Sequence, residues 1–304
     1  MERKGSVMVM NDRLFRGLGT ALITPFRGGE VDWAAYDNLI KRQIAAGADA
    51  LIICGTTGEP ATLTARERES LIRRAAELCQ GRCAVVVGTG ANDTSRAVEL
   101  SRQAQAMGAD ALLLVTPYYN KTTQAGLIAH YTAVAESVDL PMILYNVPSR
   151  TGLNLLPETA AALCRHENIC GVKEASGNLS QIAALARLCG ENIALYSGND
   201  DQTLPVLALG GQGVISVAGN VCPEQMREIT SRWFAGDAAG SRERQLALLP
   251  LIDALFSEVN PIPVKAALSM LGLCEADVRL PLVPATKLCR ARLNDAMRAL
   301  ELIS

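Results

Sequence analysis

Short runs of apolar residues alternate along the chain with longer segments in which apolar residues recur at a helical period. Because the short runs are apolar throughout rather than alternating, we expect strands that are buried on both faces, as in parallel sheets. The runs that predict strands are Thr20–Thr24, Ala50–Cys54, Ala84–Val87, Ala111–Val115, Met142–Tyr145, Cys170–Lys173, Ala194–Ser197 and Gly213–Ser216. The helical segments between them include Trp33–Ala46, Ala65–Gln80, Ser95–Met107 and Gln124–Ser137.

These strand–helix units predict an α/β fold, the closed (β/α)8 TIM barrel, although the number of strands alone does not prove closure. The strand pattern stops after about residue 236. Three helical stretches follow, namely Ala238–Glu258, Pro263–Leu271 and Ala285–Leu302. We therefore expect a catalytic barrel over residues 1–236 and a small C-terminal helical domain over residues 237–304.

The composition excludes several classes of partner. The chain has 29 basic and 31 acidic residues and a net charge of -2, so no basic field is present to attract nucleic acid. No segment approaches the roughly 18 uninterrupted apolar residues of a membrane span, and residues 1–15 lack the apolar core of a signal peptide. We expect a cytoplasmic protein that acts on small molecules.

Cysteine and histidine residues offer little material for metal or redox chemistry. The nine cysteines are scattered without a CxxC motif and mostly lie in apolar stretches, which predicts buried thiols in a reducing compartment. His130 and His166 fall in predicted helices, with no acidic residue at ligand spacing, and are interpreted as surface residues. We expect neither a metal nor a cofactor.

The candidate chemistry lies at the C-terminal ends of the strands, where barrels of this kind carry their active sites. Lys173 ends an apolar strand and should point into a dry barrel mouth, which favours the neutral amine that attacks a carbonyl. The alternative is an ion pair with Glu174, but adjacent strand residues point to opposite faces. Tyr145 ends the preceding strand and could move protons beside Lys173. A core tyrosine with a satisfied hydroxyl fits its position equally well.

Two further segments could bind carboxylates. The loop Gly55–Glu59 turns from strand to helix, and its N–H groups and the hydroxyl of Thr57 suit an anion. Arg150 follows a proline turn at a strand end and could hold a carboxylate through two hydrogen bonds. Each segment is also compatible with an ordinary role, as a βα turn or a solvated loop arginine.

Six segments, in order and at suitable spacing, resemble the dihydrodipicolinate synthase family. That family belongs to the pyruvate-dependent, N-acetylneuraminate-lyase-like aldolases. The segments are Gly55–Glu59, Gly88–Asn92, Thr116–Asn120, Tyr145–Gly152, Gly171–Ala175 and Asn260–Lys265. The resemblance covers nearly the whole chain, and six ordered segments are far more specific than one.

The resemblance implies the catalytic roles. It implies that Lys173 forms a Schiff base with pyruvate and that Tyr145 is the general acid and base. Thr56 and Tyr119 match the partners of Tyr145 in a proton relay, in which Tyr119 reaches across a subunit interface. The resemblance therefore also implies a homo-oligomer, a tetramer built as a dimer of dimers.

The resemblance implies the substrates as well. Thr57 and Ile215 match contacts to pyruvate, and Arg150 matches the residue that holds the carboxylate of L-aspartate 4-semialdehyde. The implied reaction is a class I aldolase-type condensation of these two substrates, which feeds the diaminopimelate route to lysine.

Two other functions remain open from the sequence. Another aldolase of the class, such as N-acetylneuraminate lyase or a keto-deoxy-sugar acid aldolase, would share Lys173 and Tyr145. The run Ser149–Gly152 favours the amino-acid enzyme, because an aldehyde that bears a carboxylate needs a cation. A catalytically silent barrel, kept as a binding or regulatory module, is the alternative outside catalysis. The intact set of Lys173, Tyr145, Thr56 and Tyr119 argues against it.

We predict that L-lysine inhibits this protein weakly or not at all. Lysine-sensitive members of the family bind the amino acid in a cleft at the tight-dimer interface, and Asn92 and Tyr118 keep part of that cleft here. Those members carry histidines where this chain has Ala65 and Arg68, and a glutamate where it has Arg96. Arg96 would repel the ligand ammonium, although water screens part of that repulsion. The alternative is that Arg96 is a solvated helix residue and the ligand pairs elsewhere.

Calorimetry with millimolar L-lysine tests this prediction. Tight binding together with a strong loss of activity would contradict it.

Overall fold

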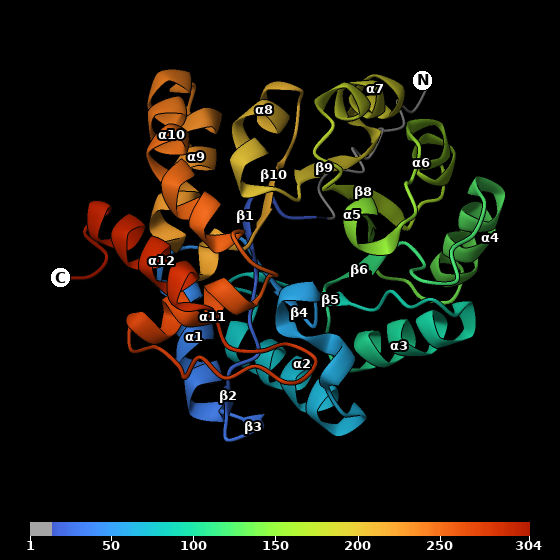
Figure 1. Cartoon of the computed structure of the whole chain (residues 1–304). Coiled ribbons are helices and arrows are strands. Elements are labelled where there is room, and N and C mark those ends of the chain that lie inside the picture. Colours follow the sequence, from blue (N-terminus) through green and yellow to red (C-terminus); the bar gives the residue numbers. More distant parts are fainter. Residues whose placement is uncertain (1–13) are drawn as a thin grey trace.

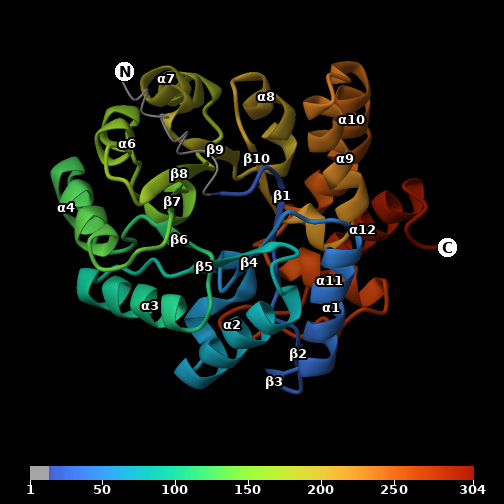
Figure 2. The ribbon, with the colours of Figure 1, turned by 180° about the vertical axis from the view of Figure 1, so that it is seen from behind.

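Eight parallel strands close into a barrel in the computed structural model, which describes residues 14–304 (Figures 1 and 2). Each strand pairs with its neighbours in sequence, and the last strand pairs with the first. The strands are β1 (Gly17–Ala21), β4 (Ala50–Ile53), β5 (Ala84–Gly88), β6 (Ala111–Val115), β7 (Met142–Asn146), β8 (Ile169–Glu174), β9 (Ala194–Ser197) and β10 (Gly213–Ser216). A separate hairpin of β2 (Phe26–Arg27) and β3 (Glu30–Val31) follows the first strand. The predicted barrel is confirmed.

Helices surround the barrel in the order in which they follow the strands (Figure 1). They are α1 (Trp33–Ala45), α2 (Ala65–Cys79), α3 (Thr94–Ala106), α4 (Gln124–Ala135), α6 (Pro157–Leu163), α7 (Leu179–Cys189), α8 (Thr203–Ala208) and α9 (Pro223–Phe234). Short helical turns stand at strand ends, namely η2 (Thr56–Gly58), η3 (Pro60–Thr62), α5 (Pro148–Thr151), η4 (Gly190–Asn192), η5 (Asp200–Gln202) and η6 (Ala218–Asn220). Of the candidate site residues, Thr56 and Thr57 lie in η2 and Arg150 lies in α5.

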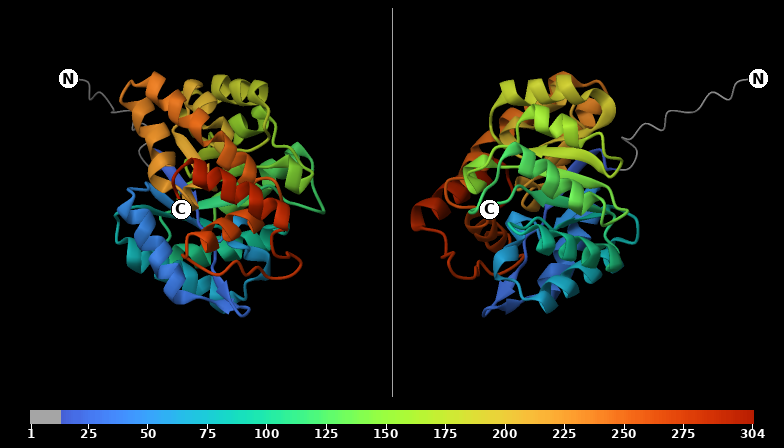
Figure 3. Two further views of the ribbon diagram at one scale, coloured as in Figure 1. Left: turned by 60° about the vertical axis from the view of Figure 1, so that its left-hand side comes forward. Right: turned by 90° about the vertical axis from the view of Figure 1, so that its right-hand side faces the viewer.

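Three C-terminal helices pack against one side of this ring, where Figure 3 shows them in orange and red. They are α10 (Ala238–Leu255), α11 (Ile262–Met270) and α12 (Lys287–Ala299), close to the predicted stretches. The helix α10 packs against α9 and α12. Whether residues 237–304 form a separate domain stays a prediction.

Alternate strand residues fill two apolar layers. Ile143 and Tyr145 point into the barrel interior, whereas Leu144 between them packs outward against the helices. This alternation explains why the strands are apolar on both faces. Within residues 14–304 no helix is both long enough and apolar enough to cross a membrane. The N-terminal residues 1–13, which bore on the signal-peptide expectation, lie outside the described part.

The sequence interpretation was wrong about the first strand and about both histidines. The first strand is Gly17–Ala21 rather than Thr20–Thr24. Its two glycines resemble a turn, but a side chain at Gly19 would approach Phe15 to 2.6 Å, so close packing of the strand requires glycine there. His130 is buried rather than on the surface, and its Nδ1 lies 2.9 Å from the hydroxyl of Thr94.

Other expectations for histidine and cysteine had mixed outcomes. His166 lies in the turn between α6 and β8, not in a helix, because α6 ends at Leu163. Burial lowers the pKa of His130. Eight of the nine cysteines are buried and Cys274 is partly exposed, so the expectation of buried cysteines is confirmed. The reducing compartment stays a prediction.

Arg279, in the loop after α11, ties the C-terminal segment to the barrel. Its guanidinium pairs with Glu67 of α2 and donates to the carbonyl of Thr62 at 2.9 Å, while its backbone N–H donates to Glu59 at 3.1 Å. Glu67 also forms a capping box with Thr64 at the start of α2. Together, Arg279 and Thr64 lower the pKa of Glu67 to about 2.

We predict that Arg279→Met removes a stabilisation that depends on pH. Because the pKa of Glu67 is lower in the folded protein than the roughly 4.3 of an unfolded chain, this stabilisation is complete above that value. It is lost as pH falls toward about 2. Denaturant unfolding at neutral and acidic pH should therefore show a larger defect of the variant at neutral pH. Arg73→Met, which breaks an exposed pair with Glu69, is the matched control and should change stability little. An Arg279→Met defect of equal size at both pH values contradicts the prediction.

Candidate active site

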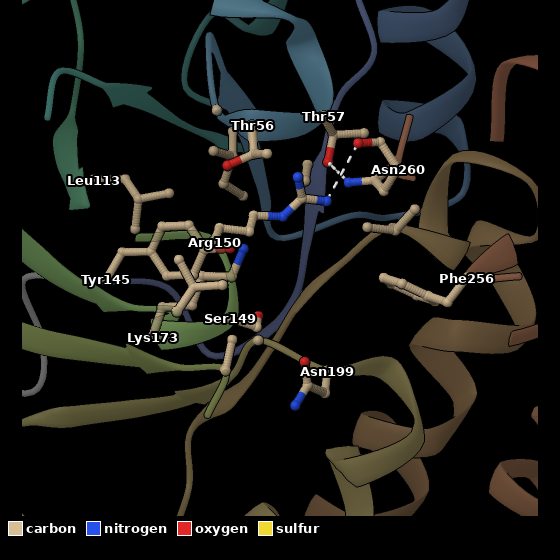
Figure 4. Close-up of a pocket in the computed structure, with 17 residues that line it drawn as sticks. Thr56, Thr57, Leu113, Tyr145, Ser149, Arg150, Lys173, Asn199, Phe256 and Asn260 are labelled. Atoms are coloured by element: carbon tan, nitrogen blue, oxygen red, sulfur yellow. Dashed lines mark hydrogen bonds between the residues drawn. The ribbon is translucent and has the colours of Figure 1, made fainter. Parts of the chain in front are cut away.

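An open cavity of about 180 Å³ lies at the C-terminal ends of the barrel strands (Figure 4). Its wall combines strand ends, the βα loops and the segment between α10 and α11. The lining residues are Ala21, Ile52, Gly55, Thr56, Thr57, Leu113, Tyr145, Val147, Ser149, Arg150, Lys173, Ala175, Gly198, Asn199, Val217, Phe256 and Asn260. Five of the seven predicted site residues therefore meet in one cavity, namely Lys173, Tyr145, Thr56, Thr57 and Arg150.

Lys173 lies on the inner face of β8 and is 6% exposed. It stands in register with Tyr145 of β7, and its Nζ lies 4.2 Å from the centroid of the Tyr145 ring. Gly198 makes room for it, because an added Cβ at that position would lie 3.1 Å from Cε of Lys173. The expected neighbourhood of Lys173 and Tyr145 is confirmed.

Glu174 points out of the barrel, away from Lys173. Its carboxylate accepts hydrogen bonds from the side-chain amide of Asn146, at 3.0 and 3.2 Å, and from the backbone N–H of Ser176 at 2.7 Å. Among the described residues no ion pair joins it to Lys173. The amine of Lys173 therefore faces the cavity without an ion pair to Glu174, as an amine nucleophile requires.

The loop after β4 presents two hydroxyls to the cavity. Gly55 precedes the helical turn η2, in which Gly58 N–H donates to Gly55 O at 2.9 Å. Thr57 is buried, and its Oγ1 accepts a hydrogen bond of 3.0 Å from the side-chain amide of Asn260. The first N–H groups of such a turn have no partner within the turn and suit an anion. The turn therefore fits the predicted carboxylate site.

Arg150 reaches the cavity from α5, the short helix after β7. Its Nη2 donates to the backbone carbonyl of Asn260 at 3.3 Å, and Figure 4 shows the guanidinium above Lys173 and beside Thr57. The structure thus places two groups suited to carboxylates, Thr57 and Arg150, on the same side of the lysine.

Two predicted site residues lie outside this cavity. Ile215 of β10 is fully buried among the inward side chains of the barrel that include Tyr145, but it does not line the cavity. Tyr119 is 90% exposed, with a left-handed backbone at φ 70°. Within one chain, the ring of Tyr119 therefore has no part in the cavity.

The structure adds site residues that the sequence interpretation missed. Asn260 and Phe256 come from the C-terminal segment, and Ser149 and Asn199 come from βα loops. Asp200 is buried beside this wall, where its Oδ2 accepts hydrogen bonds from the backbone N–H groups of Val217 and Ala218 at 3.0 and 2.9 Å. Burial raises the pKa of the Asp200 carboxyl. Asn260 belongs to a segment that carries the family resemblance, which was the available signal.

Two arginines in the region of the expected lysine cleft have partners within the chain. Arg96 forms an ion pair of 2.6 Å with Glu99 on the same helix, and Arg68 donates to the carbonyl of Gly88 at 2.7 Å. Arg96 thus resembles an ordinary solvated helix residue, and Glu99 offsets part of its charge. The prediction about L-lysine stays a prediction.

Comparison with known proteins gives one consistent result. The model of the Dihydrodipicolinate synthetase family matches residues 14–300. The 4-hydroxy-tetrahydrodipicolinate synthase of Alkaliphilus oremlandii is 50% identical over 290 residues, which are 95% of this chain and 100% of the relative. The crystal structure of dihydrodipicolinate synthase from Thermotoga maritima has 46% identity and a TM-score of 0.94, and covers 95% of this chain and 99% of that chain. A monomeric dihydrodipicolinate synthase variant has 45% identity and a TM-score of 0.94, and covers 95% and 98%.

Proposed function

The chain belongs to the dihydrodipicolinate synthetase family, and we propose that it joins pyruvate to L-aspartate 4-semialdehyde through an imine on Lys173. The activity is that of a 4-hydroxy-tetrahydrodipicolinate synthase, a lyase of lysine and diaminopimelate biosynthesis. The observation that carries the assignment of residues is the buried Lys173 beside Tyr145, in a cavity that also contains Thr57 and Arg150.

In the first half of the proposed reaction, Lys173 captures pyruvate. Its neutral amine attacks the keto carbon, and the hydroxyl of Tyr145 moves the protons that convert the carbinolamine into an imine and water. The hydroxyl of Thr57 and the N–H groups of its loop hold the pyruvate carboxylate. Holding the carboxylate places the keto carbon over Nζ of Lys173, which replaces a bimolecular encounter by a local step.

In the second half, the imine withdraws electrons and a methyl proton of bound pyruvate is lost to give an enamine. The enamine carbon attacks the aldehyde of L-aspartate 4-semialdehyde, whose carboxylate Arg150 holds in a charge-assisted contact. The amino group of the product then attacks the imine carbon, which closes the ring and releases Lys173. The imine is the electron sink throughout, so the proposed reaction uses no metal and no cofactor.

Tyr119 is the part of the proposed site that one chain does not complete. A phenol ring that is 90% exposed on a loop with left-handed backbone suits a contact with a second copy of the chain. We therefore propose that Tyr119 completes a proton relay with Thr56 and Tyr145 of a neighbouring copy, within a tetramer built as a dimer of dimers. We also assign Ile215 to the pyruvate pocket and the whole protein to the cytoplasm as parts of this proposal.

A stepwise assay tests the chemistry. Lys173→Ala and Lys173→Arg should both abolish imine formation and condensation, since a guanidinium stays protonated and does not attack. Arg150→Ala should keep the pyruvate imine but slow condensation by roughly tenfold to a hundredfold, the effect of a lost hydrogen bond to a charged group. Borohydride trapping measures the first step, and a coupled assay with both substrates measures the whole.

The outcomes separate the proposal from its rivals. An aldehyde that lacks the carboxylate is the control substrate, and Arg150→Ala should reduce the preference of the enzyme for L-aspartate 4-semialdehyde over it. Near-full turnover by Lys173→Ala overturns the central claim. Equal loss of both steps in Arg150→Ala shows that the arginine has another role.

Subunit complementation tests the placement of Tyr119. Tyr119→Phe and Lys173→Ala should each be poorly active alone, but a hybrid dimer contains one site with both Lys173 and the hydroxyl of the partner subunit's Tyr119. Random mixing of subunits in tight dimers should restore about a quarter of the wild-type sites. Light scattering should show an oligomer in all samples. A fully active monomer, or no recovery of activity after subunits exchange, contradicts the prediction.

A further inference from the structure

Asn260, at the junction between α10 and α11, contacts both Thr57 and Arg150. It is 6% exposed and lines the cavity beside the loop after β4. Its side-chain Nδ2 donates to Oγ1 of Thr57 at 3.0 Å, and its backbone carbonyl accepts from Nη2 of Arg150 at 3.3 Å (Figure 4). One residue from the C-terminal segment therefore joins the two groups assigned to the substrate carboxylates.

The direction of the bond to Thr57 determines what this hydroxyl can do. A threonine hydroxyl has one hydrogen to donate and two lone pairs that accept. Because Asn260 donates to Thr57, the hydrogen of the hydroxyl is left for another acceptor, and no described residue accepts it. The cavity is the space into which this hydrogen can be donated. A carboxylate, which only accepts, is the complementary ligand.

A buried ion pair joins the segment that follows Asn260 to the loop that carries Thr57. Lys265 of α11 is fully buried and pairs with Glu59, which ends the loop that carries Thr57. Nζ of Lys265 also donates to the carbonyl of Asp277 at 2.8 Å and lies 4.0 Å from the ring centroid of Phe26. Moving the loop away from α11 would separate the two charges and leave each one buried and uncompensated. The ion pair therefore keeps the loop and the helix in one arrangement.

We infer that Asn260 is a positioning residue that turns the Thr57 hydroxyl toward the carboxylate of pyruvate. The inference rests on the proposed function, because that function assigns the carboxylate to Thr57. Asn260 acts through Thr57 and does not itself take part in the chemistry. It makes the C-terminal segment a component of the pyruvate site, with its helix α11 held in place by Glu59 and Lys265.

Two substitutions of Asn260 should both weaken the binding of pyruvate. Asn260→Ala removes the donor, and the pyruvate concentration that half-saturates imine trapping should rise by roughly tenfold or more. Asn260→Asp keeps the shape but offers only acceptors, so Thr57 donates to it instead of to pyruvate. Asn260→Asp should therefore be at least as impaired as Asn260→Ala. If Asn260 serves only the fold, or if its amide oxygen accepts from Thr57, Asn260→Asp should retain more pyruvate affinity than Asn260→Ala.

A double-mutant cycle tests whether Asn260 acts through the hydroxyl of Thr57. In a Thr57→Val background, Asn260→Ala should change half-saturation by less than about twofold, because the group it orients is gone. In the matched Thr57→Ser background, which keeps the hydroxyl, the full effect of Asn260→Ala should return. In every variant the measured quantity is the pyruvate concentration that half-saturates imine trapping, and thermal melting should show a folded protein.

The controls separate failure of this inference from failure of the proposed function. If the wild-type protein does not trap pyruvate with borohydride, the proposed function fails before any variant is compared. If the wild type traps pyruvate and the losses from Asn260→Ala and Thr57→Val simply add, the inference about Asn260 is overturned and the function stands. If Asn260→Ala does not fold, Asn260→Asp in the three backgrounds gives the same decision.

Discussion

The chemistry depends on a largely buried lysine amine that has no counter-charge in direct contact. The closed barrel provides this, because β8 turns Lys173 inward and the next residue, Glu174, outward to Asn146. The register of β7 and β8 then sets Tyr145 beside the amine. Gly198, directly after β9, leaves the space that the lysine side chain occupies. Residues on or next to three neighbouring strands thus fix the position and surroundings of the amine. Strands hold these residues more rigidly than loops alone would.

The C-terminal segment does more than cover the barrel. The buried pair of Lys265 and Glu59 joins α11 to the loop after β4, and Arg279 joins the following loop to Glu67. A fully buried pair such as Lys265 and Glu59 contributes little net stability, but it penalises any arrangement that separates the two charges. The carboxylate-binding side of the cavity is therefore built from segments that are about 200 residues apart in sequence, as the bond between Thr57 and Asn260 shows.

The sequence predicted the parts that follow from local periodicity. The strands Ala111–Val115, Ala194–Ser197 and Gly213–Ser216 were predicted residue for residue. The positions of Tyr145 and Lys173 near neighbouring strand ends followed from the predicted runs Met142–Tyr145 and Cys170–Lys173. Long-range contacts had no local signal. The role of Asn260 and the burial of His130 arise only when distant segments pack together. Tyr119 differs again, because its proposed partner is a second chain, and the family resemblance rather than the pattern of the sequence suggested it.

The most direct measurement is a peptide mass map after treatment with pyruvate and borohydride. The account predicts one reduced pyruvate adduct, on the peptide that contains Lys173, and none when Lys173 is replaced. Lys265 serves as an internal comparison, since it is also buried but paired with Glu59, and it should remain unmodified. An adduct on Lys265 or another lysine, or condensation that proceeds with no adduct on Lys173, would contradict the account.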